Sequence, residues 1–187
     1  MRLTRLLVLA LAACAPHLAL AAGFDRTLEL LGVRFHLTCP NEGSINKLTI
    51  RATGLPHAKQ PIVVEIDGAV TGAEIDDLNG DRFPEIYVYV ASAGSGSYGS
   101  LVAYASNRNK SLTPITLPDL MDDPKNSEGY MGHDQFAVGE GTLARRFPVY
   151  KPGDPNTKPS GGTRQLQYKL KAGEAGWKLV LDRVVHF

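Results

Sequence analysis

The chain has 187 residues, of which 43% are hydrophobic and 21% are charged, and its formal net charge is +1. This near-neutral balance provides no basic surface for nucleic acid or for anionic lipid, and the length suits one domain with its own core. We therefore expect no nucleic-acid partner, and we expect any partner to be recognised by shape and hydrogen bonds.

The first 21 residues have the features of a secretory signal. The segment Met1 to Arg5 is basic, residues 6–13 are apolar, and residues 19–21 supply the small residues of a cleavage site. The apolar run is too short to cross a membrane. We expect residues 1–21 to be a signal peptide that directs the protein out of the cytoplasm, and residues 22–187 to form a single domain.

Cys14 allows a second interpretation of residues 1–21. Residues 11–14 also resemble a lipoprotein processing box, which would leave Cys14 lipidated as a membrane anchor. The residues that follow Cys14 stay apolar instead of forming a polar tether, which favours cleavage after Ala21. That cleavage leaves Cys39 without a second cysteine, so we expect it to be a buried small hydrophobic residue.

Short runs rich in β-branched and aromatic residues recur along the rest of the chain, separated by glycine, proline and polar turns. One helical turn is predicted at residues 117–121, followed by a polar loop at 122–129. This pattern predicts an all-β fold, an antiparallel β-sandwich with a barrel as the alternative, and at most one short helix. The predicted strands are 27–38 in two pieces around Leu31-Gly32, 48–50, 62–66, 70–75, 85–92, 100–105, 136–138, 142–150, 164–170 and 177–185.

The segment Ala93-Gly94-Ser95-Gly96-Ser97-Tyr98-Gly99 joins two of these strands with an unusually bare backbone. Glycine permits positive φ and close approach, serine supplies small hydroxyls, and Tyr98 is the one large side chain of the segment. Gly94, Gly96 and Gly99 fit a G-x-G-x-x-G pattern, but only about eight residues precede the next turn, too few for the crossover helix of a dinucleotide fold. An ordinary Gly/Ser turn and a loop that contacts a partner both remain open.

An acidic turn precedes this hairpin. Asp77, Asn79, Asp81 and Glu85 place side-chain oxygens at alternate positions, as at the start of a calcium-binding loop. Arg82 stands where such loops usually have glycine. The sequence therefore leaves two interpretations open, a calcium site or a plain turn in which Asp and Asn side chains bond the backbone.

Nothing in the sequence predicts catalysis or a bound cofactor. The histidines His36, His57, His133 and His186 are scattered, without the spacing of metal ligands. His133-Asp134 could orient a general base, but no activated nucleophile accompanies it, which favours a surface turn as the explanation of the pair. We therefore expect a protein that is not an enzyme, with no catalytic residues and no cofactor.

The tip Ser95-Gly96-Ser97-Tyr98 resembles the S-G-x-Y signature of bacterial periplasmic inhibitors of invertebrate-type (i-type) lysozymes, the PliI group. The segments 77–88, 145–154 and 161–164 are also similar to that family, so the resemblance extends over about residues 62–185. A related group of inhibitors of vertebrate-type (c-type) lysozymes carries S-G-x-x-Y and Y-x-x-x-T-K-G. The chain has neither pattern, which favours the i-type target.

The resemblance implies an all-β, dimeric, periplasmic protein that protects bacterial peptidoglycan from host lysozyme. It implies that the loop Ser95, Gly96, Ser97 and Tyr98 enters the lysozyme cleft, and that Gly94 and Gly99 shape this loop. The expected partners are lysozyme and a second copy of the chain, with no membrane unless Cys14 is lipidated. A secreted carbohydrate- or calcium-binding β module is the alternative.

Export provides the first test. In the bacterial periplasm, the mature protein is expected to begin at Ala22, because the small residues at 19–21 fit the signal peptidase site. Intact-mass spectrometry of the exported protein measures this directly. An acylated Cys14 at the N-terminus would instead establish the lipoprotein interpretation.

Overall fold

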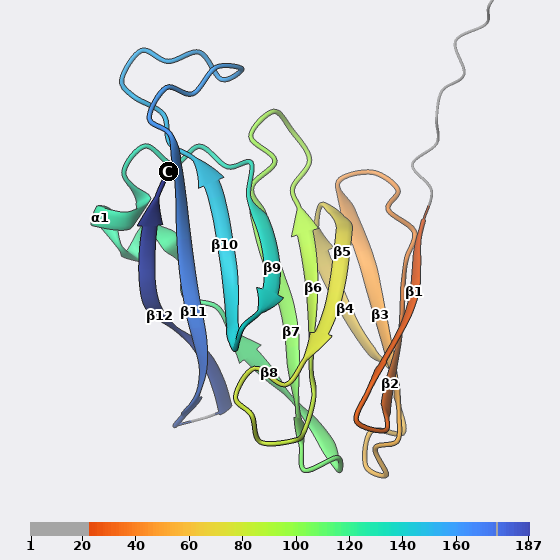
Figure 1. Ribbon diagram of the computed structural model, residues 1–187. Helices are drawn as coiled ribbons and strands as arrows, with labels where there is room; N and C mark the ends of the chain where they lie inside the picture. Colours follow the sequence, from red (N-terminus) through yellow and green to blue (C-terminus); the bar gives the residue numbers. More distant parts are fainter. Residues whose placement is uncertain (1–22, 175) are drawn as a thin grey trace, which may run out of the picture.

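The computed structural model describes residues 23–174 and 176–187, so the predicted signal peptide and Cys14 lie outside the described residues. The described chain forms two β-sheets (Figure 1). The smaller sheet has the order β1-β2-β3-β4 and is antiparallel throughout. Its strands are β1 (Phe24–Leu30), β2 (Val33–Cys39), β3 (Ile45–Thr53) and β4 (Ile62–Asp67).

The larger sheet has the order β5-β6-β7-β8-β12-β11-β10-β9. Neighbouring strands within this sheet are antiparallel, except that β8 and β12 pair in parallel. Its strands are β5 (Ala69–Asp76), β6 (Glu85–Ala91), β7 (Gly99–Asn107), β8 (Ser111–Thr116), β9 (Gln135–Gly139), β10 (Thr142–Pro148), β11 (Thr163–Gly173) and β12 (Gly176–His186).

The two ends of the larger sheet approach each other, so the sheet is nearly closed and barrel-like. The backbone N–H of Val138 on β9 donates to Glu74 Oε2 on β5 at 2.9 Å. Inside the sheet, the rings of Tyr89 and Phe136 stack with their centroids 5.5 Å apart. A nearly closed sheet leaves little unpaired strand edge exposed.

β6 is the strand shared by the two hydrophobic cores. Six of its seven residues are buried, as expected for a continuous apolar run without polar alternation. Ile86, Val88 and Val90 pack with β2, β3 and β5 between the two sheets. Tyr87 and Tyr89 point the other way and pack with β7, β10, β11 and β12 inside the larger sheet.

The all-β prediction is confirmed, with a sandwich between the two sheets and a barrel-like larger sheet. The helical turn predicted at 117–121 corresponds to a 3-10 turn, η1 (Leu120–Asp122). The prediction of a polar loop at 122–129 was partly wrong, because the four-residue helix α1 (Pro124–Ser127) lies there. The side chain of Asp123 caps this helix and Pro124 starts it, a local signal that the loop assignment missed.

No helix within the described ranges has the length and apolar character needed to cross a membrane. Cys39 ends β2 and is buried between the sheets, as the sequence predicted.

The burial of Cys39 predicts a protected thiol. In the folded mature protein, its modification by an aromatic disulfide reagent should be at least about 1,000-fold slower than in denaturant, because a typical folding free energy leaves very few chains open. The rate is measured by absorbance with and without guanidinium chloride. Rapid modification of the native protein would show that β2 does not close the core.

Candidate functional site

The loop at residues 92–98 joins β6 to β7 and projects from one end of the larger sheet (Figure 1). The long connection between β10 and β11, residues 149–162, lies at the same end. The acidic loop between β5 and β6 lies at the opposite end. The two motifs that the sequence singled out therefore occupy opposite ends of the same strand, β6.

The backbone of the 92–98 loop is closed by its own hydrogen bonds. Ser92 and Tyr98 exchange two of them: the Ser92 N–H donates to the Tyr98 carbonyl, and the Tyr98 N–H donates to Ser92 Oγ, each at 2.9 Å. Between them, the Ser97 N–H donates to the Gly94 carbonyl at 3.3 Å, which forms a turn at the tip. The tip is thus a defined turn that carries few side chains.

Tyr98 is half-exposed, with 50% of its surface accessible, and its ring is held in place by two neighbours. It lies edge-to-face with Tyr130, with the centroids 5.6 Å apart. It also covers Gly96, where a Cβ atom would lie only 2.5 Å from Tyr98 Cε2. A glycine at position 96 is therefore required for this ring position, and the aromatic surface is pre-oriented.

A second segment, residues 130–134, is hydrogen-bonded to the 92–98 loop and to the start of β7. The His133 N–H donates to the Gly96 carbonyl at 2.7 Å, and the Gly99 N–H donates to Asp134 Oδ2 at 2.7 Å. Gly132 makes the close approach possible, since it has a φ of +89° and a Cβ there would lie 2.0 Å from the Gly96 oxygen. The tip is therefore attached to this segment through Gly96 within it and through Gly99 directly after it.

A buried ion pair anchors this support. Arg145 Nε on β10 donates to Asp134 Oδ1 at 2.6 Å, and the two side chains are 6% and 0% exposed. Tyr130 completes the network, because its hydroxyl donates to Asp134 Oδ2 at 2.5 Å and accepts from Arg145 Nη2 at 2.7 Å. Arg145 Nη2 also reaches the Gly99 carbonyl at 3.5 Å. Gly99, the first residue of β7, is therefore hydrogen-bonded to both Asp134 and Arg145.

The protonation states of this network are fixed by its surroundings. Burial, followed by the hydrogen bond to Asp134, raises the pKa of Tyr130, which keeps the phenol neutral. Burial alone would lower the pKa of Arg145, but the hydrogen bond and charge of Asp134 outweigh it, and the pKa is raised. Arg145 therefore stays charged, and Tyr130 keeps the proton that it donates to Asp134.

The β10–β11 connection adds a third support. Asn156 Nδ2 donates to the carbonyl of Ser95 at 3.2 Å, and the Tyr150 hydroxyl donates to the carbonyl of Asn156 at 2.9 Å. Asp154 fixes the connection itself, because its carboxylate accepts from the backbone N–H groups of Lys151 and Ser160, each at 2.8 Å. Ser95 itself remains exposed.

A groove of about 620 Å³ opens beside Tyr98. Its walls come from β7, from the segment after β8 and from the buried network, and Met121 on its rim is exposed. Aromatic and aliphatic side chains line much of it, namely Tyr98, Leu101, Ile115, Leu117, Met121 and Tyr130. The tip therefore adjoins a concave, partly apolar surface.

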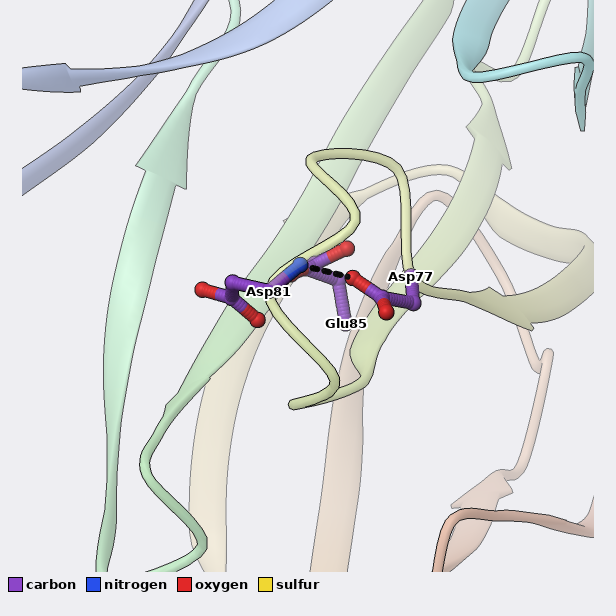
Figure 2. A group of neighbouring side chains, drawn as sticks. All are labelled: Asp77, Asp81 and Glu85. Carbon is purple, nitrogen blue, oxygen red and sulfur yellow. Dashed lines mark hydrogen bonds between the residues drawn. The ribbon is translucent and has the colours of Figure 1, made fainter.

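At the other end of β6, the structure brings the acidic residues together. Asp77, Asp81 and Glu85 each place a carboxylate oxygen within 4.8 Å of the others (Figure 2). Asn79 joins them through its amide, which donates to Asp81 Oδ2 at 3.0 Å. Burial, followed by the charges of Asp81 and Asp77, raises the pKa of Glu85 to about 8.

The residues that support the tip are not predicted from the sequence. The sequence suggests Asp134 only as a partner of His133, whereas the structure pairs Asp134 with Arg145. The signal was present in β10, where alternation places Arg145 on the same inward face as Leu143 and Phe147. An arginine on a core face requires a buried anionic partner. The sequence does not say which carboxylate that is.

The buried pair should control stability. Asp134→Asn leaves the charge of Arg145 buried without a counter-ion, so we expect the free energy of unfolding to fall by about 3–5 kcal/mol. Urea denaturation of the mature protein measures this change.

Asp25→Asn is the matched control, because Asp25 pairs with His36 and its side chain is 72% exposed. This substitution should cost less than about 1 kcal/mol. Equal effects of the two substitutions would contradict the anchoring role of the Asp134–Arg145 pair.

Comparison with known proteins relates this architecture to one family. A family model described as periplasmic lysozyme inhibitor of I-type lysozyme (PliI) matches residues 51–125. This range contains both the acidic loop and the 92–98 loop, whereas the similar segments at 145–154 and 161–164 lie outside it. No curated protein and no solved structure matches the chain. The match confirms the resemblance seen in the sequence: over residues 51–125, this chain matches the PliI family of periplasmic inhibitors of i-type lysozyme.

Proposed function

We propose that this protein is a periplasmic inhibitor of i-type lysozyme that inserts the 92–98 loop into the active-site cleft. The observation that carries the proposal is the exposed tip Ser95-Gly96-Ser97-Tyr98, held rigidly by a buried ion pair and lying inside the segment that matches the family. By blocking the cleft, the inhibitor would protect bacterial peptidoglycan from host lysozyme.

The shape of the tip suits a glycosidase cleft. Such a cleft is a groove for an extended sugar polymer, with two catalytic carboxylates about 5–9.5 Å apart. A thin loop can enter this groove, whereas the face of a sheet cannot. The exposed hydroxyl of Ser95 can donate to a catalytic carboxylate, and a hydrogen bond to a charged group contributes about 1.5–3 kcal/mol.

Tyr98 would supply apolar contact in a sugar subsite. An aromatic side chain buries about 150–250 Å² in total, and Tyr98 still exposes half of its surface. Burying that half at about 25 cal/mol per Å² gives about 2–3 kcal/mol. The phenol can add a hydrogen bond within the cleft.

The hydrogen bonds that order the tip also support its proposed role in the cleft. Association costs free energy for every loop and side chain that must be ordered, so a tip ordered in advance loses less. Here the Gly96 carbonyl and the Gly99 amide are bonded to the segment 130–134, and the Ser95 carbonyl is bonded to Asn156 of the β10–β11 connection. The tip is therefore suited to bind with little rearrangement.

The groove beside Tyr98 would extend the contact. A stable protein interface buries about 800 Å² on each partner, which is more than a four-residue tip offers. Leu117 and Met121 line the groove, and Met121 exposes 63% of its surface. We propose that the rim of the lysozyme cleft packs over them while the tip occupies the cleft.

We include a homodimer in the proposal, because the resemblance implies one. Sedimentation equilibrium of the mature protein measures its mass, and a mass equal to one chain at micromolar concentration would remove this part of the proposal. The inhibitory loop itself does not depend on it.

Replacing the aromatic anchor tests the mechanism. Tyr98→Ala should weaken inhibition of i-type lysozyme by about 2–4 kcal/mol, or 30- to 1,000-fold, because buried aromatic residues dominate interface energies. Ser95→Ala should cost less, since water can replace its hydrogen bond. Both are measured as inhibition constants against i-, c- and g-type lysozymes.

Leu31→Ala is the matched control. Leu31 lies in the turn between β1 and β2 and is also 50% exposed, and this turn is at the opposite end of the molecule from the 92–98 loop (Figure 1). It should leave inhibition unchanged, and all three variants should retain the parent's thermal midpoint within a few degrees. If Tyr98→Ala inhibits as well as Leu31→Ala does, the loop is not the inhibitory element.

A further inference from the structure

We propose that the loop between β5 and β6 binds a calcium ion through Asp77, Asn79, Asp81 and Glu85. The loop lies at the end of the molecule opposite the 92–98 loop, so the proposal is independent of lysozyme binding (Figure 1). The sequence left open a calcium site and a plain turn, and this proposal selects the calcium site.

The separation of the carboxylates fits a single calcium ion. Calcium binds oxygen ligands at about 2.3–2.6 Å, so two oxygens on opposite sides of the ion are about 5 Å apart at most. Asp77, Asp81 and Glu85 each offer an oxygen within 4.8 Å of the others. Figure 2 shows Asp77 and Asp81 on the loop and Glu85 behind them.

Glu85 gives independent evidence for a ligand. It is only 1% exposed, and its Oε2 accepts from the Leu78 N–H at 2.8 Å. Its Oε1 is buried and has no hydrogen-bond partner among the described residues. A buried polar atom without a partner is costly, and a bound cation would provide that partner.

No positive side chain compensates for these charges. Among the ion pairs of the described chain, none involves Asp77, Asp81 or Glu85. Three carboxyl groups therefore converge without an ion pair to any side chain of the described residues. A divalent cation would remove most of their mutual repulsion.

The backbone of the loop also accommodates the ion. Asp77 Oδ1 accepts from the Asp81 N–H at 3.0 Å and its Oδ2 accepts from the Arg82 N–H at 2.8 Å, which curls the loop around this carboxylate. Arg82 replaces the glycine usual in calcium loops, yet it has a φ of 69°. The arginine therefore adopts the left-handed conformation for which glycine is normally selected.

The donor set favours calcium over other metals. All of the candidate ligands are oxygens, whereas zinc and copper prefer histidine or cysteine. Carboxylates, an amide and the Phe83 carbonyl, which is at the seventh position of the loop, can reach the six to eight ligands of calcium with added water. Magnesium requires a more regular octahedron and keeps more of its water. The ion would join the end of β5 to the start of β6.

Calorimetric titration of the chelator-treated mature protein with calcium chloride tests the proposal. We expect one ion per chain, with a dissociation constant below about 1 mM. At a hundredfold excess over that constant, the thermal midpoint should rise by roughly 5–10 °C. Asp77→Asn and Asp81→Asn should each weaken calcium binding at least tenfold.

Asp122→Asn is the control, since Asp122 is an exposed aspartate in η1, outside the loop. It should bind calcium as the parent does. The proposal is overturned if 10 mM calcium produces neither heat nor a shift in the midpoint, if magnesium binds equally well, or if Asp122→Asn loses binding to the same extent. Lysozyme inhibition by ion-free Asp81→Asn should equal that of the ion-free parent, so this test and that of the inhibitory loop can fail separately.

Discussion

The structure depends on a single strand, β6, being buried on both faces. Its isoleucine and valine side chains fill the space between the sheets, and its two tyrosines fill the interior of the larger sheet. Because both cores pack on this strand, its ends are fixed in position. One end begins at Glu85 in the acidic loop, and the other leads into the 92–98 loop. The rigid strand thus positions both candidate sites.

The two ends of β6 differ in how their buried acidic side chains are satisfied. At the loop end, the charge of Asp134 is neutralised by Arg145, and Tyr130 satisfies the remaining oxygen. At the acidic end, Glu85 is buried without a cationic side chain. The Asp134–Arg145 pair therefore needs no further partner, whereas the unpartnered Oε1 of Glu85 supports the calcium site that we propose.

Local patterns were sufficient to predict most of the strands and the all-β fold. Alternation in residues 164–170 and the apolar run in 85–92 reflect burial on one face and on two faces, and each is encoded by adjacent residues. The nearly closed larger sheet could not be predicted, because it depends on the pairing of β8 with β12, strands about 60 residues apart. Such pairings leave no periodic signal.

The site was predictable only in part, for the same reason. The exposed tip is a contiguous motif, so Ser95 to Tyr98 could be identified from composition and resemblance. Its support is not contiguous: Gly99, Asp134 and Arg145 meet only in the folded chain. Alternation in β10 is consistent with an inward-facing Arg145, but adjacent residues do not identify the carboxylate that neutralises it. The orphaned oxygen of Glu85 is likewise visible only in three dimensions.

In the proposed mechanism, the tip occupies the site where lysozyme binds its substrate. The most direct measurement is the inhibition of i-type lysozyme at increasing concentrations of a soluble peptidoglycan oligosaccharide. Insertion into the cleft makes inhibitor and substrate mutually exclusive, so the apparent inhibition constant should rise linearly with substrate concentration. An inhibition constant that does not change with substrate concentration would show that the inhibitor binds elsewhere and would contradict the account.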